Sequence, residues 1–229
     1  MEPNSRQPIL NIPVDPEHGR LRITLLLLFI LLVGVSFSVL NAFIPSAGLN
    51  ILALLGGFAV AAALSYFVVE PFLKRRWPSG RAVEMDGDAI RIIQHGAVQR
   101  SVNVREPFSI LLWNFKIKQR RNRVPAGWFV VACALEQDDA YLPVYTLASP
   151  QQMEMLTALA RFVTLIPEKT GRSSEVRQES LRVAGEQRRL RLAESHRWAE
   201  GAEMSLADFQ QFIQRLHEHF PQWVPLNNR

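Results

Sequence analysis

The chain has 229 residues, 48% of them hydrophobic, and a formal net charge of +5 at pH 7. These averages hide two unlike parts, a long uncharged apolar stretch and a more polar remainder, which excludes a single uniform globular domain. Basic residues gather beside that stretch and in residues 116–123 and 172–197, which favours membrane topology or contact with anionic lipid over a nucleic-acid partner. The single cysteine, Cys133, excludes an intramolecular disulfide, and its apolar surroundings in the sequence indicate a buried thiol.

Residues 23–69 contain no Asp, Glu, Lys or Arg, and the turn signal Pro45-Ser46-Ala47-Gly48 divides this run near its middle. At about 1.5 Å of rise per residue, each half spans roughly 30 Å, the thickness of the hydrocarbon core of a bilayer. The run therefore predicts a transmembrane helical hairpin over residues 23–73. The lack of ionisable residues at membrane depth argues against ion or proton translocation.

Basic residues flank the predicted hairpin on both sides but are missing from its central loop. They are Arg20 and Arg22 before the first span, and Lys74, Arg75, Arg76 and Arg81 after the second. By the positive-inside rule both termini face the cytoplasm, and residues 1–22 form a cytoplasmic N-terminal segment. We expect a multi-pass protein of the cell (inner) membrane, in contact with membrane lipid.

Small residues recur at every fourth position in both predicted spans. They are Gly34, Ser38 and Ala42 in the first span, and Ala53, Gly57, Ala61 and Ser65 in the second. This spacing keeps small side chains on one face of a helix, where two backbones can approach closely. We expect the two stripes to pack the helices of the hairpin against each other, and dimerisation through the same faces is the alternative.

Residues 79–168 predict a β-rich domain. Runs with strand character cover residues 82–85, 89–94, 98–104, 108–115, 128–135 and 141–145. Asp86-Gly87-Asp88 is a hairpin turn signal between the first two runs. Ser149-Pro150-Gln151-Gln152 is a capping box with proline in the first turn, and it begins an amphipathic helix that runs to Ile166. Antiparallel strands closed by a helix indicate an α+β fold.

This order of parts resembles the membrane-anchored bacterial proteins that carry a pleckstrin-homology-like (PH-like) domain. It is also similar in layout to the photosystem I assembly protein family. The resemblance covers residues 23–167, with Asp86-Gly87-Asp88 and Ser149-Pro150 as its local anchors. It implies a barrel-like antiparallel β-domain closed by a helix, and a role in binding or assembly rather than catalysis.

Basic residues cluster between two apolar strand runs, in a predicted hairpin loop. They are Lys116, Lys118, Arg120, Arg121 and Arg123. If this loop faces a bilayer, each charge gains roughly 1 kcal/mol against anionic lipid. The same residues would suit an acidic face of a protein partner, and an ordinary solvated loop is the remaining alternative.

Residues 169–229 predict a helical C-terminal tail. Its first part, 171–200, is rich in arginine and glutamate and indicates a solvated helix or a partly ordered linker. Its last part begins at Ser205 and places one apolar and aromatic face on a helix, formed by Leu206, Phe209, Phe212, Ile213, Leu216 and Phe220. This face docks on the chain's own β-domain, on a protein partner or second copy, or in the membrane interface.

The chain contains no nucleophile elbow and no phosphate-binding glycine loop. Glu84, Asp86 and Asp88 are fewer ligands than a calcium loop needs, and His217 and His219 point in different directions on a helix. We therefore expect no metal, no cofactor and no enzymatic activity. The predicted function is a scaffold or assembly/accessory subunit at the cytoplasmic membrane face, and an anionic-lipid-binding or sensing module using loop 116–123 is the alternative.

Overall fold

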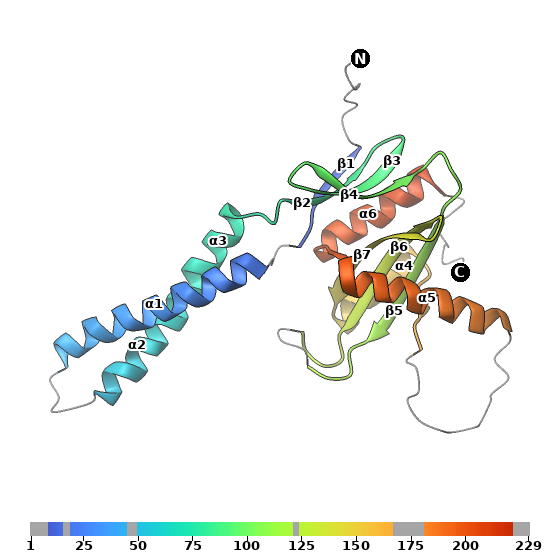
Figure 1. Cartoon of the computed structure of the whole chain (residues 1–229). Coiled ribbons are helices and arrows are strands. Elements are labelled where there is room, and N and C mark those ends of the chain that lie inside the picture. The colour runs from blue at the N-terminus through green and yellow to red at the C-terminus, as the bar shows by residue number, and fades with distance from the viewer. Residues whose placement is uncertain (1–8, 16–18, 45–49, 121–123, 167–180, 222–229) are drawn as a thin grey trace, which may run out of the picture. The chain divides into compact units, whose positions relative to one another are not determined.

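The computed structural model describes residues 9–15, 19–44, 50–120, 124–166 and 181–221. The chain divides into two compact units (Figure 1). Asp15–Ser79 form the first unit, which we call the apolar hairpin, and Met1–Val14 with Gly80–Arg229 form the second, which we call the β-domain. The hairpin is therefore inserted into the sequence of the β-domain, whereas residues 1–22 were expected to be a separate segment.

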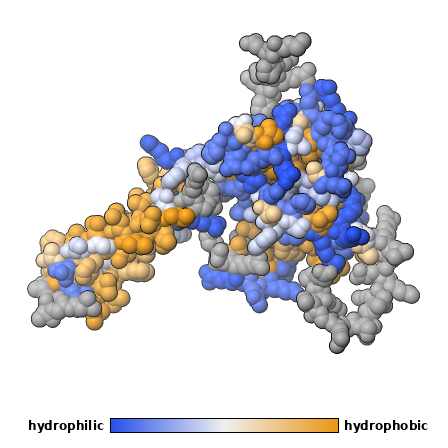
Figure 2. Space-filling view, in the orientation of Figure 1, coloured by the Kyte–Doolittle hydropathy of each residue, from blue (hydrophilic) through white to orange (hydrophobic). Residues whose placement is uncertain are grey.

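The apolar hairpin is built from helices α1 (Gly19–Phe43), α2 (Ile51–Leu64) and α3 (Glu70–Arg76), with a π-helical segment, Ser65–Val69, between α2 and α3. Two stretches, Leu21–Phe43 and Ile51–Lys74, are long and apolar enough to cross a membrane. Figure 2 shows the hydrophobic surface that these helices expose along their length.

The π-helical segment has a local cause in Pro71, which has no backbone N–H. An α-helical hydrogen bond to the carbonyl of residue 67 therefore cannot form. The backbone N–H of Glu70 bonds instead to the carbonyl of Ser65, five residues back. This wider turn lets the helix continue through the proline into α3.

The two long helices pack side by side through the small residues of α2. Ala53, Gly57 and Ala61 are the buried residues of α2. A Cβ on Gly57 would lie 2.8 Å from the backbone N of Phe37, so glycine permits the closest approach of the helices. The stripe of α1 differs from our expectation, because Gly34, Ser38 and Ala42 are exposed and a Cβ on Gly34 would meet no atom within 4 Å.

One sheet of the β-domain contains, among the described residues, four antiparallel strands in the order β1-β2-β3-β4. They are β1 (Leu10–Pro13), β2 (Arg81–Met85), β3 (Ala89–Gln94) and β4 (Ala97–Asn103). β1 precedes the apolar hairpin and β2 follows it, with Ile12 opposite Val83. The hairpin therefore connects two neighbouring strands of one sheet.

The other sheet has the order β8-β5-β6-β7-β9 among the described residues. Its strands are β5 (Ser109–Lys116), β6 (Phe129–Gln137), β7 (Ala140–Ala148), β8 (Val163–Thr164) and β9 (Ala202–Glu203). β5, β6 and β7 form an antiparallel meander, while the two-residue strands β8 and β9 pair in parallel at its edges.

Three helices complete the β-domain: α4 (Pro150–Leu159), α5 (Leu181–Glu200) and α6 (Leu206–His219). The predicted capping box of α4 is confirmed, since Ser149 and Gln152 exchange side-chain and backbone hydrogen bonds. α4 ends at Leu159 rather than at Ile166, because the backbone is extended at Ala160 and the chain then pairs with β5 as β8. The predicted N-cap of the last helix is confirmed by the bond from the Asp208 N–H to the Ser205 hydroxyl.

The β5–β7 sheet has two buried faces, with side chains alternating between them as in any strand. Residues such as Leu112 and Cys133 join the main core, which includes the first sheet, α4 and α6. Residues such as Trp113 and Ala132 face the other way and pack with Leu190 of α5. Figure 1 shows α4 and α5 on opposite sides of these strands. α5 is thus a packed helix, whereas a solvated helix or linker was expected.

Candidate functional site

The basic loop lies where β5 ends and the chain turns toward β6. Lys116 is the last residue of β5 and pairs with Phe129. Beyond it, the Ile117 N–H donates to the Trp128 carbonyl at 2.7 Å, and the Gly127 N–H donates to the Ile117 carbonyl at 2.9 Å. Lys116, Lys118 and Arg120 are exposed, while Arg121 and Arg123 fall outside the described residues.

A pocket of about 340 Å³, which we call the β5-end pocket, brings two of these lysines together with residues distant in sequence. It is lined by Phe115, Lys116, Lys118, Thr164, Leu165 and Glu194. Phe115 and Leu165 provide apolar surface, and the two lysines provide positive charge. An apolar pocket with a few placed charges is the usual form of a small-molecule site.

The carboxylate of Glu194 in this pocket is held by a buried polar network. It accepts hydrogen bonds from the Trp113 indole N–H at 3.0 Å and from the Arg197 guanidinium at 2.7 and 2.6 Å. Arg197 is only 7% exposed, and its Cζ lies 4.7 Å from the ring centroid of Tyr145 and 5.9 Å from that of Phe115. Because Arg197 compensates Glu194, the lysines set the charge preference of the pocket toward anions.

The α5 residues of this region were missed by sequence reasoning, which followed hydropathy. Gln187, Leu190, Glu194 and Arg197 recur at helical spacing and share one face of α5. Gln187 accepts from the Ile166 N–H at 3.0 Å and donates to the Thr164 carbonyl at 3.1 Å. Their helical spacing indicates that they share one face. Because three of the four are polar, hydropathy does not predict that this face is buried.

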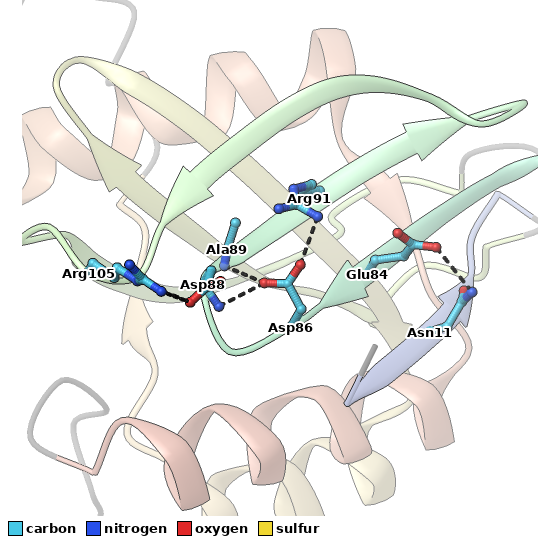
Figure 3. Close-up of polar contacts among 7 residues, drawn as sticks. All are labelled: Asn11, Glu84, Asp86, Asp88, Ala89, Arg91 and Arg105. Atoms are coloured by element: carbon cyan, nitrogen blue, oxygen red, sulfur yellow. Dashed lines mark hydrogen bonds and ion pairs between the residues drawn. The ribbon is translucent and has the colours of Figure 1, made fainter. Parts of the chain in front are cut away.

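The three acidic residues near the β2–β3 turn point to three different partners (Figure 3). Glu84 accepts from the Asn11 amide at 3.3 Å, Asp86 pairs with Arg91 at 2.7 Å, and Asp88 pairs with Arg105 at 2.6 Å. Asp86 also accepts from the backbone N–H groups of Asp88 and Ala89, as a turn-forming aspartate does. The trio therefore stabilises the turn and does not converge on a common point.

Two carboxyl groups of the β-domain have lowered pKa values. Burial opposes the ionisation of Asp86, but the bonds from the Asp88 and Ala89 N–H groups and from Arg91 outweigh it and hold its pKa below the ordinary value. For Glu136 burial again opposes ionisation, and the bonds from Arg189 and from the Tyr141 hydroxyl outweigh it.

Two further groups have raised pKa values. Burial and the neighbouring Glu136 carboxylate raise the pKa of Tyr141 to about 12. Cys133 is buried as expected, and burial raises its thiol pKa far above the ordinary value. A buried neutral thiol is a poor nucleophile, so Cys133 acts as a core residue.

The apolar and aromatic face predicted for the last helix lies against the chain's own β-domain. Phe209, Phe212, Ile213 and Leu216 are buried in the main core, and Leu206 and Phe220 pack against it. The ring of Phe220 also meets that of Phe108 edge-on, with centroids 5.5 Å apart. The chain's own β-domain therefore covers this face.

Within the described part of the chain, no three His, Cys, Asp or Glu side chains come together as metal ligands would. Comparison of the chain with protein families, with characterised proteins and with solved structures yields no match.

Proposed function

We propose that this protein is a non-enzymatic scaffold or assembly/accessory subunit, anchored in the cell (inner) membrane by the apolar hairpin, with both termini on the cytoplasmic side. The insertion of the hairpin between β1 and β2 supports this proposal. Two neighbouring strands of one sheet continue directly into the two ends of the hairpin, with Val14 and Arg81 still hydrogen-bonded. Such a domain is tethered at two points, which suits a module that holds a partner in a fixed place.

The resemblance to PH-like domains belongs to the same proposal. The antiparallel first sheet, the antiparallel meander of the second, mixed sheet and the helices packed in their shared core support it. The domain differs from a simple order of anchor followed by domain, since its first strand precedes the anchor.

The scaffold function is tested by removing the hairpin without disturbing the sheet. In one variant, residues 15–80 are replaced by Asn-Gly, a turn suited to joining Val14 to Arg81. We expect the full chain to co-purify with a stoichiometric partner from membranes in mild detergent, and the shortened chain to bind the same partner in the soluble fraction. Recovery of both chains alone, also after chemical cross-linking in cells, would exclude a scaffold.

A second candidate function, binding of anionic lipid, is favoured by the β5-end pocket. Its apolar Phe115 and Leu165 suit an acyl chain, while Lys116 and Lys118 suit a phosphate headgroup. Arg120, which follows in the loop, would add to the attraction, as would Arg121 and Arg123 outside the described residues.

This second function is tested with dioctanoyl phosphatidylglycerol, titrated into the full chain in micelles of a neutral detergent. Phosphatidylcholine of the same chain length and inorganic phosphate serve as comparison ligands. We expect phosphatidylglycerol to bind more tightly than either comparison ligand. Its affinity should fall roughly tenfold or more in the double variant Lys116→Gln with Lys118→Gln. Arg188→Gln with Arg215→Gln removes the same charge elsewhere and should leave affinity unchanged; equal losses in both variants would refute a specific site.

A further inference from the structure

A larger groove runs beside β5, and we call it the β5-edge groove. Its volume is about 980 Å³, and its lining comes from three segments of the β-domain. β5 contributes Ile110 and Leu112, the chain leading into β8 contributes Phe162, and α5 contributes Val183 and Leu190. The groove is thus lined largely by apolar side chains, and it lies at the edge of a sheet.

Among the described residues, the β5 edge beside this groove has no ladder partner at Ile110 and Leu112. The Asn114 carbonyl accepts from the Leu165 N–H at 2.8 Å, so the backbone of Asn114 points toward β8. Because N–H and C=O directions alternate along a strand, Leu112 and Ile110 direct their backbone groups to the same edge. Within the described residues, β8 pairs only with Trp113 and Asn114 of β5. The ladder therefore stops where the groove begins.

We propose that the β5-edge groove binds an extended peptide segment of a protein partner, which adds a strand to β5 in line with β8. The edge-directed backbone groups of Ile110 and Leu112 would pair with the main chain of the peptide, and alternate side chains would contact Phe162 on one side and Leu190 on the other. This inference rests on the proposed scaffold function and names the surface that would hold the partner.

The charges around the groove indicate the chemistry of the segment. Two arginines, Arg161 and Arg189, line it against one acidic residue, Glu186. Arg189 is paired with Glu136, which leaves Arg161 as the stronger attraction for an incoming carboxylate. The segment would therefore alternate apolar residues with polar or acidic ones. The chain's own residues 167–180 contain one aliphatic residue besides proline, Val176, and lack this alternation.

The proposal is tested with the full chain in detergent and a fluorescein-labelled peptide in which valine alternates with glutamate or threonine. A second peptide of the same sequence carries N-methyl groups on alternate amides, which removes the main-chain donors. Gly185→Leu fills the groove, because a Cβ on Gly185 meets no atom within 4 Å and leucine favours a helix. Ala184→Leu, an exposed neighbour on the same helix, is the matched control.

We expect fluorescence anisotropy to show binding of the unmethylated peptide, with affinity at least about tenfold lower for the methylated peptide and for Gly185→Leu, and unchanged for Ala184→Leu. Equal binding of both peptides, equal binding by Gly185→Leu, or no binding by the wild-type chain at about 100 µM would overturn the proposal. Binding of a fluorescent fatty acid that Gly185→Leu abolishes, without peptide binding, would make the groove a lipid site instead. A partner that still co-purifies with Gly185→Leu would leave the scaffold function intact and exclude only this surface.

Discussion

The backbone N–H of Val14 donates to the carbonyl of Arg81 at 3.0 Å, although the whole apolar hairpin lies between these residues in the chain. Strand β1 and the residue that follows it add Leu10, Ile12 and Val14 to the main core of the β-domain. A residue range that starts after the hairpin therefore omits part of the core. This pair of residues marks where the chain can be shortened while the core of the β-domain stays whole.

The first prediction concerns fragments of the chain. A fragment of residues 79–229 should lack a cooperative unfolding transition and should aggregate, because β2 loses its neighbour β1 and three core side chains are missing. Each buried aliphatic side chain contributes about 1.5–3 kcal/mol, a large share of the stability of a domain. The joined β-domain, with Val14 linked to Arg81 through Asn-Gly, should unfold cooperatively in urea. A stable fragment of 79–229 would show that β1 is dispensable.

The second prediction concerns the packing of the hairpin. Gly57→Ala places a methyl group 2.8 Å from the Phe37 backbone N and should destabilise the helix pair by about 1–3 kcal/mol. Gly34→Ala is the matched control, since its methyl group meets open space and alanine favours a helix. Unfolding of the full chain by SDS titration measures both variants. Equal behaviour of the two would mean that Gly57 does not mark the contact between α1 and α2.

The third prediction concerns the buried network under α5. Arg197→Met should lower the free energy of unfolding of the joined β-domain by about 2–4 kcal/mol, because Glu194 then keeps a charge in a half-buried position without its cation. Adding Glu194→Gln should restore part of that loss. Arg188→Met, on the exposed side of the helix, should change the free energy by less than about 0.5 kcal/mol. Urea denaturation monitored by tryptophan fluorescence gives all three values.

The fourth prediction concerns acid. Asp86 and Glu136 have lower pKa values in the folded state than in the unfolded chain, so the unfolded state binds protons first as the pH falls. The stability that these groups contribute is present above the unfolded-state pKa values, near 4, and is lost as the pH falls through the lower folded-state values. Urea titrations of the joined β-domain between about pH 6 and pH 3 should show this decline.

The double variant Asp86→Asn with Glu136→Gln should be less stable near neutral pH and should show a flatter decline. Glu154→Gln, a change of an exposed carboxyl group on α4, should keep the wild-type slope. A double variant with the wild-type slope would mean that other carboxyl groups carry the acid response.

Features that depend on local chemistry could be predicted from the sequence. The turn at Asp86-Gly87-Asp88 follows from an aspartate that bonds its own downstream N–H groups, and the start of α4 follows from its capping box. Each of these signals lies within a few residues of the structure it determines.

Features that depend on distant partners could not be predicted. Nothing in Leu10–Pro13 indicates that its partner strand starts at Arg81. The buried face of α5 carries Gln187 and Arg197, whose burial becomes acceptable only through bonds to Thr164, Ile166 and Glu194. The β5-end pocket joins residues from three separated segments, so the sequence indicated its lysines but not its walls.

The insertion of the hairpin also determines the order in which the chain can fold. β1 is synthesised first, yet it cannot pair until β2 has been synthesised. At about 5–20 residues per second, this takes several seconds. Closing so long a loop costs conformational entropy, but two helices that already pack side by side bring its ends together and shorten the loop that remains to be closed. Assembly of the hairpin thus sets the pace for completion of the sheet, and a variant with a slow hairpin would accumulate chains whose first strand is unpaired.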